Sequence, residues 1–296
     1  MYYGNTINHR YDFLLAFDVV NGNPNGDPDA GNSPRMDPET GHGLVSDVCL
    51  KRKIRDFITL TQVDKSGCPR QGYDIYVRHG AILNQQHQKA YEALGLEEKK
   101  GLDNTAKARL WMCQTFFDIR TFGAVMTTGV NCGQVRGPLQ LAFARSVDPI
   151  ISLEQAITRK AVTREEDAKK QLDKDGHITG TFGRKEIIPY GLYVVHGFIN
   201  PYLAQATGFS EEDLEFVWQS LLWMFEQDHS ATRAEMATRK LIIFKHQSKL
   251  GNAPAHALFD RVHFQAKKTP ARSFADYEIQ TNAEGLPEGV ELIEKM

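Results

Sequence analysis

Apolar residues occupy both faces of the segment over residues 11–20, which reads Tyr-Asp-Phe-Leu-Leu-Ala-Phe-Asp-Val-Val. Such a run is typical of a buried β-strand. The segment that follows, over residues 21–43, is rich in Gly, Pro, Asn and Asp and predicts a long irregular loop. A helix is expected over about residues 46–60, because apolar positions return there at helical spacing. Its apolar face consists of Leu50, Ile54, Phe57 and Ile58.

Two strands are expected in the middle of the chain. Alternation of apolar and polar positions predicts one over about residues 137–147, with Leu139, Leu141 and Phe143 on one face. A second apolar run, rich in Ile, Val and Tyr, predicts a strand over about residues 187–199.

The helical period returns over about residues 211–229, behind Ser210 as an N-cap and an acidic first turn. A last strand is expected over about residues 240–246. The resulting order, β-α-β-β-α-β, is that of the ferredoxin-like fold, which RNA-recognition modules share. The predicted fold class is therefore α+β.

Two insertions and a tail complete this RRM-like palm. The segment over about residues 61–136 looks mostly helical, and the polar segment over about residues 148–186 separates the two middle strands. Long connections of this kind are often functional. The C-terminal extension covers about residues 266–296. The palm itself is expected to comprise residues 8–60, 137–147 and 187–265.

Composition narrows the class of protein. The chain of 296 residues has 41% hydrophobic and 24% charged residues, as ordinary globular proteins do. No apolar run approaches the roughly 20 residues that span a bilayer, and the N-terminus has no secretory pattern, so the cytoplasm is the expected compartment. The four cysteines are scattered and predict neither a disulfide framework nor a zinc site.

Charge is distributed unevenly, although the net charge is only −2. On the first helix, Lys51, Arg52 and Arg55 fall within roughly 100° of one another, and Lys53 lies on the other flank. Such side chains are usually just solvated. Three cations on one arc directly after a Gly-rich loop also fit a site for a phosphate backbone.

The polar insertion mixes basic and aromatic residues, as proteins that hold single-stranded nucleic acids do. A mobile charged loop is the competing interpretation. The Gly-rich segment over residues 129–137 brings Arg136 and Gly137 to a phosphate or forms a simple turn. The candidates of the insertion are Arg159, Lys160, Arg164, Phe182, Arg184 and Lys185.

The loop over residues 21–43, which we call the acidic loop, is a candidate metal site because it contains four acidic residues. Asp27 and Asp29 are spaced like the start of a calcium loop, but Gly31 and Asn32 stand where that loop needs an oxygen ligand and a glycine. Gly, Pro, Asn and Asp are also the residues that turns require. We therefore expect no metal, no cofactor and, since other catalytic motifs are missing, no catalytic residue.

Five segments resemble the backbone subunit of type I-C CRISPR Cascade, of the Cas seven family in the RAMP superfamily. They read FDVVNGNPNGDP, SDVCLKRKIR, FDIRTFG, QVRGPLQ and PYGLY, over residues 17–28, 46–55, 117–123, 134–140 and 189–193. The resemblance runs in matching order from about residue 8 to residue 265.

This resemblance implies a hand-shaped chain, with an RRM-like palm, a helical finger insertion and a thumb hairpin within residues 148–186. Many copies would line up along one CRISPR guide RNA and present it for pairing with target DNA. The other implied partners are the guide-processing, large and small subunits of Cascade and, indirectly, a recruited helicase-nuclease. Besides the residues of the thumb, the implied RNA-binding residues are Asn21, Asn23, Asn25, Ser46, Lys51, Arg52, Arg55, Arg136 and Gly137.

The resemblance also leaves one alternative. Related backbone subunits of type III complexes cut target RNA with a loop aspartate, for which Asp27 or Asp29 would be the candidate here. The DNA-targeting subtype favours a non-catalytic scaffold.

Overall fold

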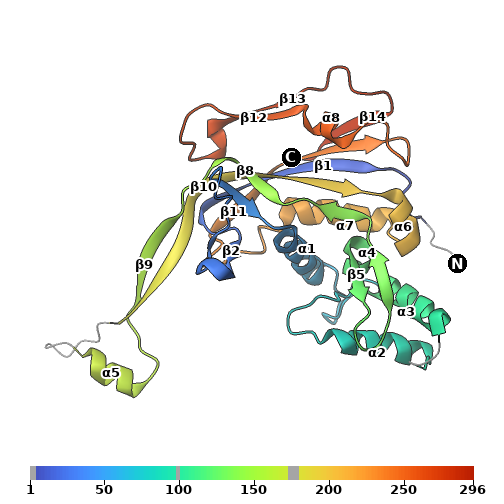
Figure 1. Ribbon diagram of the computed structural model, residues 1–296, viewed down its shortest axis with the longest axis horizontal. Coiled ribbons are helices and arrows are strands. Elements are labelled where there is room, and N and C mark those ends of the chain that lie inside the picture. Colours follow the sequence, from blue (N-terminus) through green and yellow to red (C-terminus); the bar gives the residue numbers. More distant parts are fainter. Residues whose placement is uncertain (1–4, 98–100, 173–179) are drawn as a thin grey trace.

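The computed structural model describes residues 5–97, 101–172 and 180–296, and it is an α+β structure built on one antiparallel sheet (Figure 1). The order of the main strands is β14-β11-β1-β10-β8-β4, and β7 pairs with β10 beyond the end of β8. No helix within the described residues is long and apolar enough to cross a membrane. The strands are β1 (Tyr11–Gly22), β4 (His42–Val45), β7 (Leu139–Leu141), β8 (Ala144–Pro149), β10 (Thr181–Ile199), β11 (Glu235–His246) and β14 (Val290–Glu294).

Helices α1 (Asp47–Thr61) and α7 (Glu211–Trp223) cover one face of the sheet, as their apolar faces predict (Figure 1). The Trp218 indole meets the ring of Phe13 edge to face at 5.2 Å, and the ring of Phe17 stacks on that of Tyr193 at 5.5 Å. Ser210 caps α7 in a reciprocal capping box with Asp213. The short helix α6 (Pro201–Thr207) precedes it.

The C-terminal part of the chain covers the other face of the sheet (Figure 1). It comprises α8 (Ala255–Phe259), the hairpin of β12 (Val262–Ala266) and β13 (Tyr277–Thr281), and the turn η2 (Phe274–Asp276). Edge strand β14 carries Glu291 and Glu294, which lie 3.7 Å and 3.4 Å from the ammonium groups of Lys245 and Lys240. The acidic C-terminus is thus partly neutralised within the sheet.

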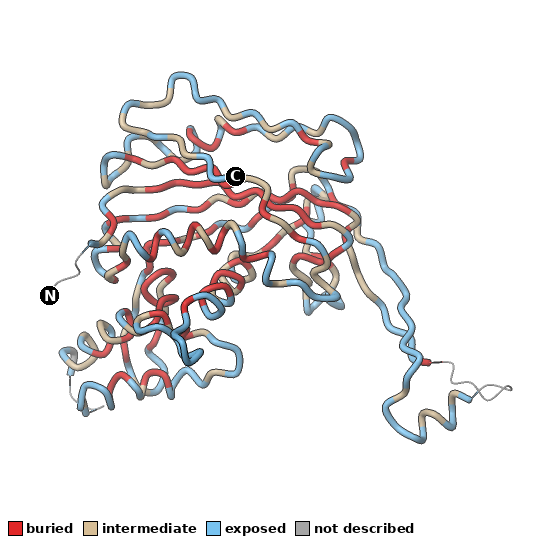
Figure 2. The backbone as a smooth tube through the Cα atoms, turned by 180° about the vertical axis from the view of Figure 1, so that it is seen from behind, coloured by how far each residue is buried: buried red, intermediate tan, exposed pale blue. Residues whose placement is uncertain are grey.

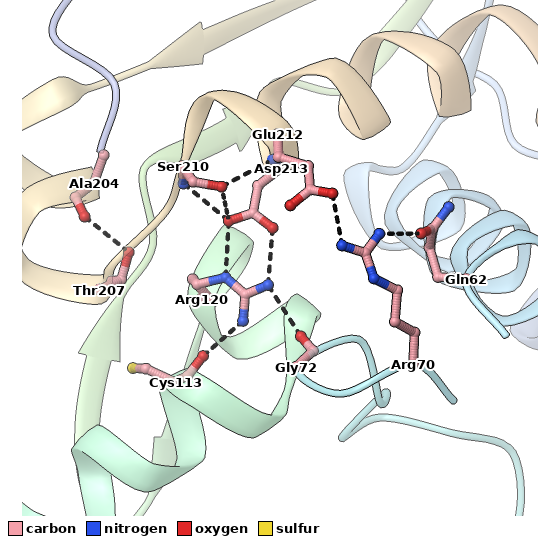
Figure 3. A network of polar contacts seen from close by, with 10 residues as sticks. All are labelled: Gln62, Arg70, Gly72, Cys113, Arg120, Ala204, Thr207, Ser210, Glu212 and Asp213. Atoms are coloured by element: carbon pink, nitrogen blue, oxygen red, sulfur yellow. Dashed lines mark hydrogen bonds and ion pairs between the residues drawn. The ribbon is translucent and has the colours of Figure 1, made fainter. Parts of the chain in front are cut away.

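Residues 61–136 form a helical block with its own hydrophobic cluster, which includes Tyr91, Met112 and Phe116. Arg120 joins this block to α7 through two hydrogen bonds to Asp213 (Figure 3). Its elements are α2 (Leu83–Leu94), α3 (Gly101–Thr115), α4 (Phe117–Phe122), β5 (Gly123–Met126) and β6 (Gly133–Arg136).

An arm projects from the sheet between β8 and β10 (Figure 1). Strand β9 (Leu153–Arg159) pairs with the first part of β10, from Leu153 opposite Ile187 to Arg159 opposite Thr181. Helix α5 (Glu165–Gln171) lies at its far end, and residues 173–179 of the expected thumb lie outside the described residues. The arm is exposed along nearly all of its length (Figure 2). Ile150, by contrast, is buried in the core, so the exposed hairpin is shorter than residues 148–186.

Several predicted boundaries were wrong. The strand expected over residues 137–147 is split into β7 and β8, and Phe143 is 56% exposed although Leu139 and Leu141 are buried. Between the pairs Leu141–Gly197 and Arg145–Val194 the chain advances four residues against three on β10. This extra residue acts as a β-bulge, and it reverses which positions face the core.

Other elements were missed or mis-sized. The acidic loop contains the small hairpin of β2 (Gly26–Asp27) and β3 (Ser33–Pro34) around the turn η1 (Pro28–Ala30). Strand β4 was not expected, because its His-Gly-Leu-Val sequence is too short to show a period. The helix expected to reach residue 229 ends at Trp223.

Candidate nucleic-acid interface

The start of α1 is fixed by the loop before it. Asn25 Oδ1 accepts hydrogen bonds from the backbone N–H and the hydroxyl of Ser46, both at 2.9 Å. The Ser46 Oγ in turn accepts one from the Cys49 N–H at 3.3 Å. Because a helix N-terminus carries partial positive charge, this arrangement aims a positive end at the loop.

A groove of about 640 Å³ opens beside this helix start, and we call it the basic groove. Four cationic side chains line it against one carboxylate, that of Asp228. Its lining residues are Asn25, Gly26, Pro28, Arg35, Ser46, Val48, Cys49, Arg52, Lys53, Phe143, Asp228 and Arg233. A surplus of cations beside a helix N-terminus suits a phosphate group.

The three cations of the predicted arc lie in different environments. The Arg52 side chain is 38% exposed, lines the basic groove and lies 3.5 Å from Asp56. The Lys51 ammonium lies 2.8 Å from Asp47 and above the ring of Phe122. The Arg55 guanidinium is 2.7 Å from the buried Asp118 and only 11% exposed.

Lys53 lies in the groove although the helical wheel put it on the other flank. Its side chain is 2% exposed and contacts the Asp228 carboxylate, which Arg233 approaches at 3.4 Å. Burial lowers the pKa of Lys53 to about 8, while the direct contact with Asp228 favours the charged form. Arg233 also donates to the Pro24 carbonyl at 2.9 Å, so it ties the acidic loop to the end of the sheet.

The remaining loop asparagines shape the backbone. Asn21 has a positive φ of 50°, a conformation that Asn tolerates better than most residues. Asn23 is fully buried and its Nδ2 donates to the Asn32 carbonyl at 2.7 Å. Both residues hold the loop that walls the basic groove.

Of the two aspartates of the nuclease alternative, Asp27 makes structural contacts through its carboxylate and Asp29 through its backbone N–H. Asp27 Oδ1 accepts from the backbone N–H of Asp29 at 3.2 Å, and its Oδ2 lies 3.3 Å from Arg35. Among the residues that the structure describes, no group of three or more His, Cys, Asp or Glu side chains is placed to share a metal ion. The geometry thus gives this alternative no added support.

Arg136 ends β6 opposite Gly123, one residue from Phe122. It is exposed, and within the described residues its guanidinium has no hydrogen-bond or ion-pair partner. A Cβ on Gly137 would lie 2.3 to 2.4 Å from backbone atoms of residues 121–123, so close packing alone demands glycine there. Arg136 is thus available to a ligand beside Phe122.

The arm presents the other predicted residues. Phe182 is 74% exposed, and Arg184 lies 3.1 Å from Glu154 across the hairpin. Arg184 and Lys185 also line a second groove of about 590 Å³, which runs between the arm and the loop over residues 30–33. Arg159, Lys160 and Arg164 follow toward the far end of the arm and are all exposed.

The fold therefore unites Asn25, Ser46 and Arg52 in one groove, and it keeps the arm residues apart from them. Sequence reasoning missed Arg35 and Arg233, which reach the groove from the loop and from the segment before β11. Neither lies in a basic cluster, so only the tertiary fold identifies them.

Comparisons with known proteins agree on one family. The family model described as CRISPR-associated protein Cas7 matches residues 9–282. A protein of Haloferax volcanii described as CRISPR-associated protein Cas7 is 24% identical over 264 residues, which cover 82% of this chain and 72% of that protein.

Among solved structures, a chain of a CRISPR RNA-guided surveillance complex, pre-nicking, matches with a TM-score of 0.52 and 17% identity. The match covers 79% of this chain and 75% of that chain, and it supports a shared fold. Because the family model spans nearly the whole sequence, this chain belongs to the Cas7 family of CRISPR-associated proteins.

Proposed function

We propose that this protein is an RNA-binding backbone subunit of a type I Cascade complex, of subtype I-C, and that it acts as a scaffold and not as an enzyme. Copies would line up along one CRISPR guide RNA and present it to target DNA. The other partners would be the guide-processing, large and small subunits of Cascade and a recruited helicase-nuclease. Family membership supports the role of an RNA-binding backbone subunit, and the motifs over residues 17–28 and 46–55 support the subtype.

The palm in this proposal is ferredoxin-like. The strand order β11-β1-β10-β8 with α1 and α7 on one face supports it, because that fold alternates two β-α-β units in one antiparallel sheet. The helical block over residues 61–136 would be the fingers, and the arm of β9 and β10 the thumb.

The basic groove carries the proposal. It combines the N-terminus of α1 with Arg35, Arg52 and Arg233, and its single acid, Asp228, is occupied by Lys53. Guanidinium groups beside a helix N-terminus are typical phosphate ligands, so the groove would hold the RNA backbone in any sequence. Arg136 would extend the contact along the RNA backbone.

The arm supplies a different contact. Its exposed Phe182 and Ile157 are large apolar side chains on a hairpin that leaves the body of the protein. Single-stranded bases stack on or are separated by such side chains, while neighbouring cations hold the phosphates. Arg159, Lys160, Arg164, Arg184 and Lys185 are the cations of the arm.

Binding to a labelled single-stranded RNA across a salt series tests the proposal. We expect Arg52→Ala to weaken binding to all sequences alike and to lower the salt slope by about 0.7, the value for one phosphate contact on a single strand. Arg78→Ala is the matched control, because Arg78 is also exposed and also faces an aspartate four residues away. Equal affinities for the wild type and Arg52→Ala would contradict this assignment.

A further inference from the structure

Phe143 is a large apolar side chain that is exposed to solvent. It lies at the bulge between β7 and β8 and is 56% exposed, whereas its neighbour Ala144 is fully buried. Its ring borders two grooves at once, because it lines the basic groove and also a groove on the far side of β8. An apolar ring between two open grooves is a surface available to a ligand.

The second of these, which we call the aromatic groove, has a volume of about 660 Å³. It runs between β8 and the C-terminal cover of the sheet, and residues of β10, α8 and β12 also line it. The His196 and Phe259 rings stack at 4.0 Å with an angle of 9° between their planes. Phe264 and Phe143 add two further aromatic side chains to the lining.

One carboxylate, that of Asp260, and one guanidinium, that of Arg145, line the aromatic groove, so a neutral, flat ligand suits it. Burial lowers the pKa of His196, so its imidazole is uncharged at neutral pH. Arg145 is about half exposed and uses one terminal nitrogen for Asp37 and Thr40, at 2.8 Å and 2.7 Å. Arg145 also lines the aromatic groove.

We propose that the aromatic groove binds an unstacked nucleobase of the RNA whose phosphates lie in the basic groove, with the Phe143 ring as its stacking surface. This inference rests on the proposed function, because the basic groove must hold RNA for a base to arrive there. The shared wall at Phe143 supports it, since Phe143 lines both grooves and RNA held in the basic groove would lie next to the ring. Base-aromatic stacking tolerates any sequence, as a guide-binding surface requires.

A pair of polymers tests the proposal, oligouridine RNA and the same backbone with stable abasic spacers in place of the nucleosides. Phe143→Ala should lose about 5- to 150-fold in affinity for the RNA, the range for removing one stacking ring, and nothing for the abasic polymer. Phe143→Trp should keep the affinity of the wild type. Val125→Ala, at another exposed apolar position, is the control and should change neither.

The same assay tests the proposed function independently of the stacking site. Arg52→Ala should weaken binding to both polymers, because both carry the phosphates. Equal losses on both polymers for Phe143→Ala, or no loss on either, would overturn the stacking site while leaving the basic groove intact. Unchanged RNA affinity with altered self-association in light scattering would assign the groove to a protein contact and also overturn it. A wild-type protein that binds neither polymer would overturn both proposals.

Discussion

Arg120 is a buried link between the helical block and the palm. Its Nε and one terminal nitrogen donate to the two oxygens of Asp213 at 2.9 and 2.8 Å (Figure 3). The same guanidinium donates to the carbonyls of Cys113 at 2.8 Å and Gly72 at 3.0 Å. The side chains are only 9% and 2% exposed. Burial alone would lower the pKa of Arg120, but the hydrogen bonds to Asp213 and the neighbouring negative charges together outweigh burial and raise that pKa.

Replacing Arg120 by Met should therefore greatly reduce the free energy of unfolding. Removing one partner of a buried ion pair costs about 3–5 kcal/mol, because the other charge stays buried without compensation. Asp213 keeps its hydrogen bonds from the Ser210 N–H and hydroxyl. We expect a loss near the lower end, about 3 kcal/mol of unfolding free energy. A second substitution, Asp213→Asn, should recover about 1 kcal/mol, since it removes the stranded charge and keeps an acceptor for the cap.

Urea unfolding measures the loss, and amide hydrogen exchange locates it. Protection should fall first in α3 and α4, which the guanidinium ties to α7. Arg70→Met is the matched control, because Arg70 pairs with Glu212 on the same helix at 2.8 Å but both side chains are about half exposed. Such surface pairs contribute at most about 1 kcal/mol. Similar losses for Arg120→Met and Arg70→Met would refute the reasoning.

Three further outcomes follow from the structure. Gly137→Ala should cost about 1–3 kcal/mol of unfolding free energy in urea, because the added Cβ would overlap backbone atoms. Gly183→Ala is the control and should cost under about 1 kcal/mol, because its Cβ would have its nearest contact at 3.4 Å. Equal costs would contradict the packing argument. Replacing residues 154–186 by an Asn-Gly turn should leave the melting temperature nearly unchanged, because the hairpin buries little, and global unfolding would show otherwise. Iodoacetamide at pH 8 should label Cys68 and spare Cys113, because burial raises the pKa of the Cys113 thiol to about 11 and only the thiolate reacts; labelling of native Cys113 would speak against its burial.

Local pattern was enough for the elements that carry a strong period. The two-sided apolar run predicted β1, which is buried on both faces, and helical spacing predicted α1 and α7, each of which buries one continuous face, although α7 ends earlier than expected. The prediction that Phe143 shares a face with Leu139 and Leu141 was wrong for an equally clear reason. A one-residue bulge reverses the inside and outside of a strand, and nothing in the local pattern around Phe143 marks one.

The candidate site was predicted only in part. The helical wheel identified Arg52 as an exposed cation, but it could not tell that Arg55 meets Asp118 or that Lys53 meets Asp228. These partners lie 63 and 175 residues away in the sequence. Long-range ion pairs leave no local signal in the sequence. Only the three-dimensional structure therefore shows which cations are held in structural ion pairs and which are free to bind a ligand.

We propose above all that copies of this chain assemble along a guide RNA. Such a scaffold needs different surfaces for its two neighbours, a contact that extends a filament and does not close a dimer. The most direct measurement is the mass of particles reconstituted on a series of RNAs of increasing length. We predict that mass rises in steps of one subunit for each fixed increment of RNA. A particle that stays a monomer or a dimer on every RNA would contradict the account.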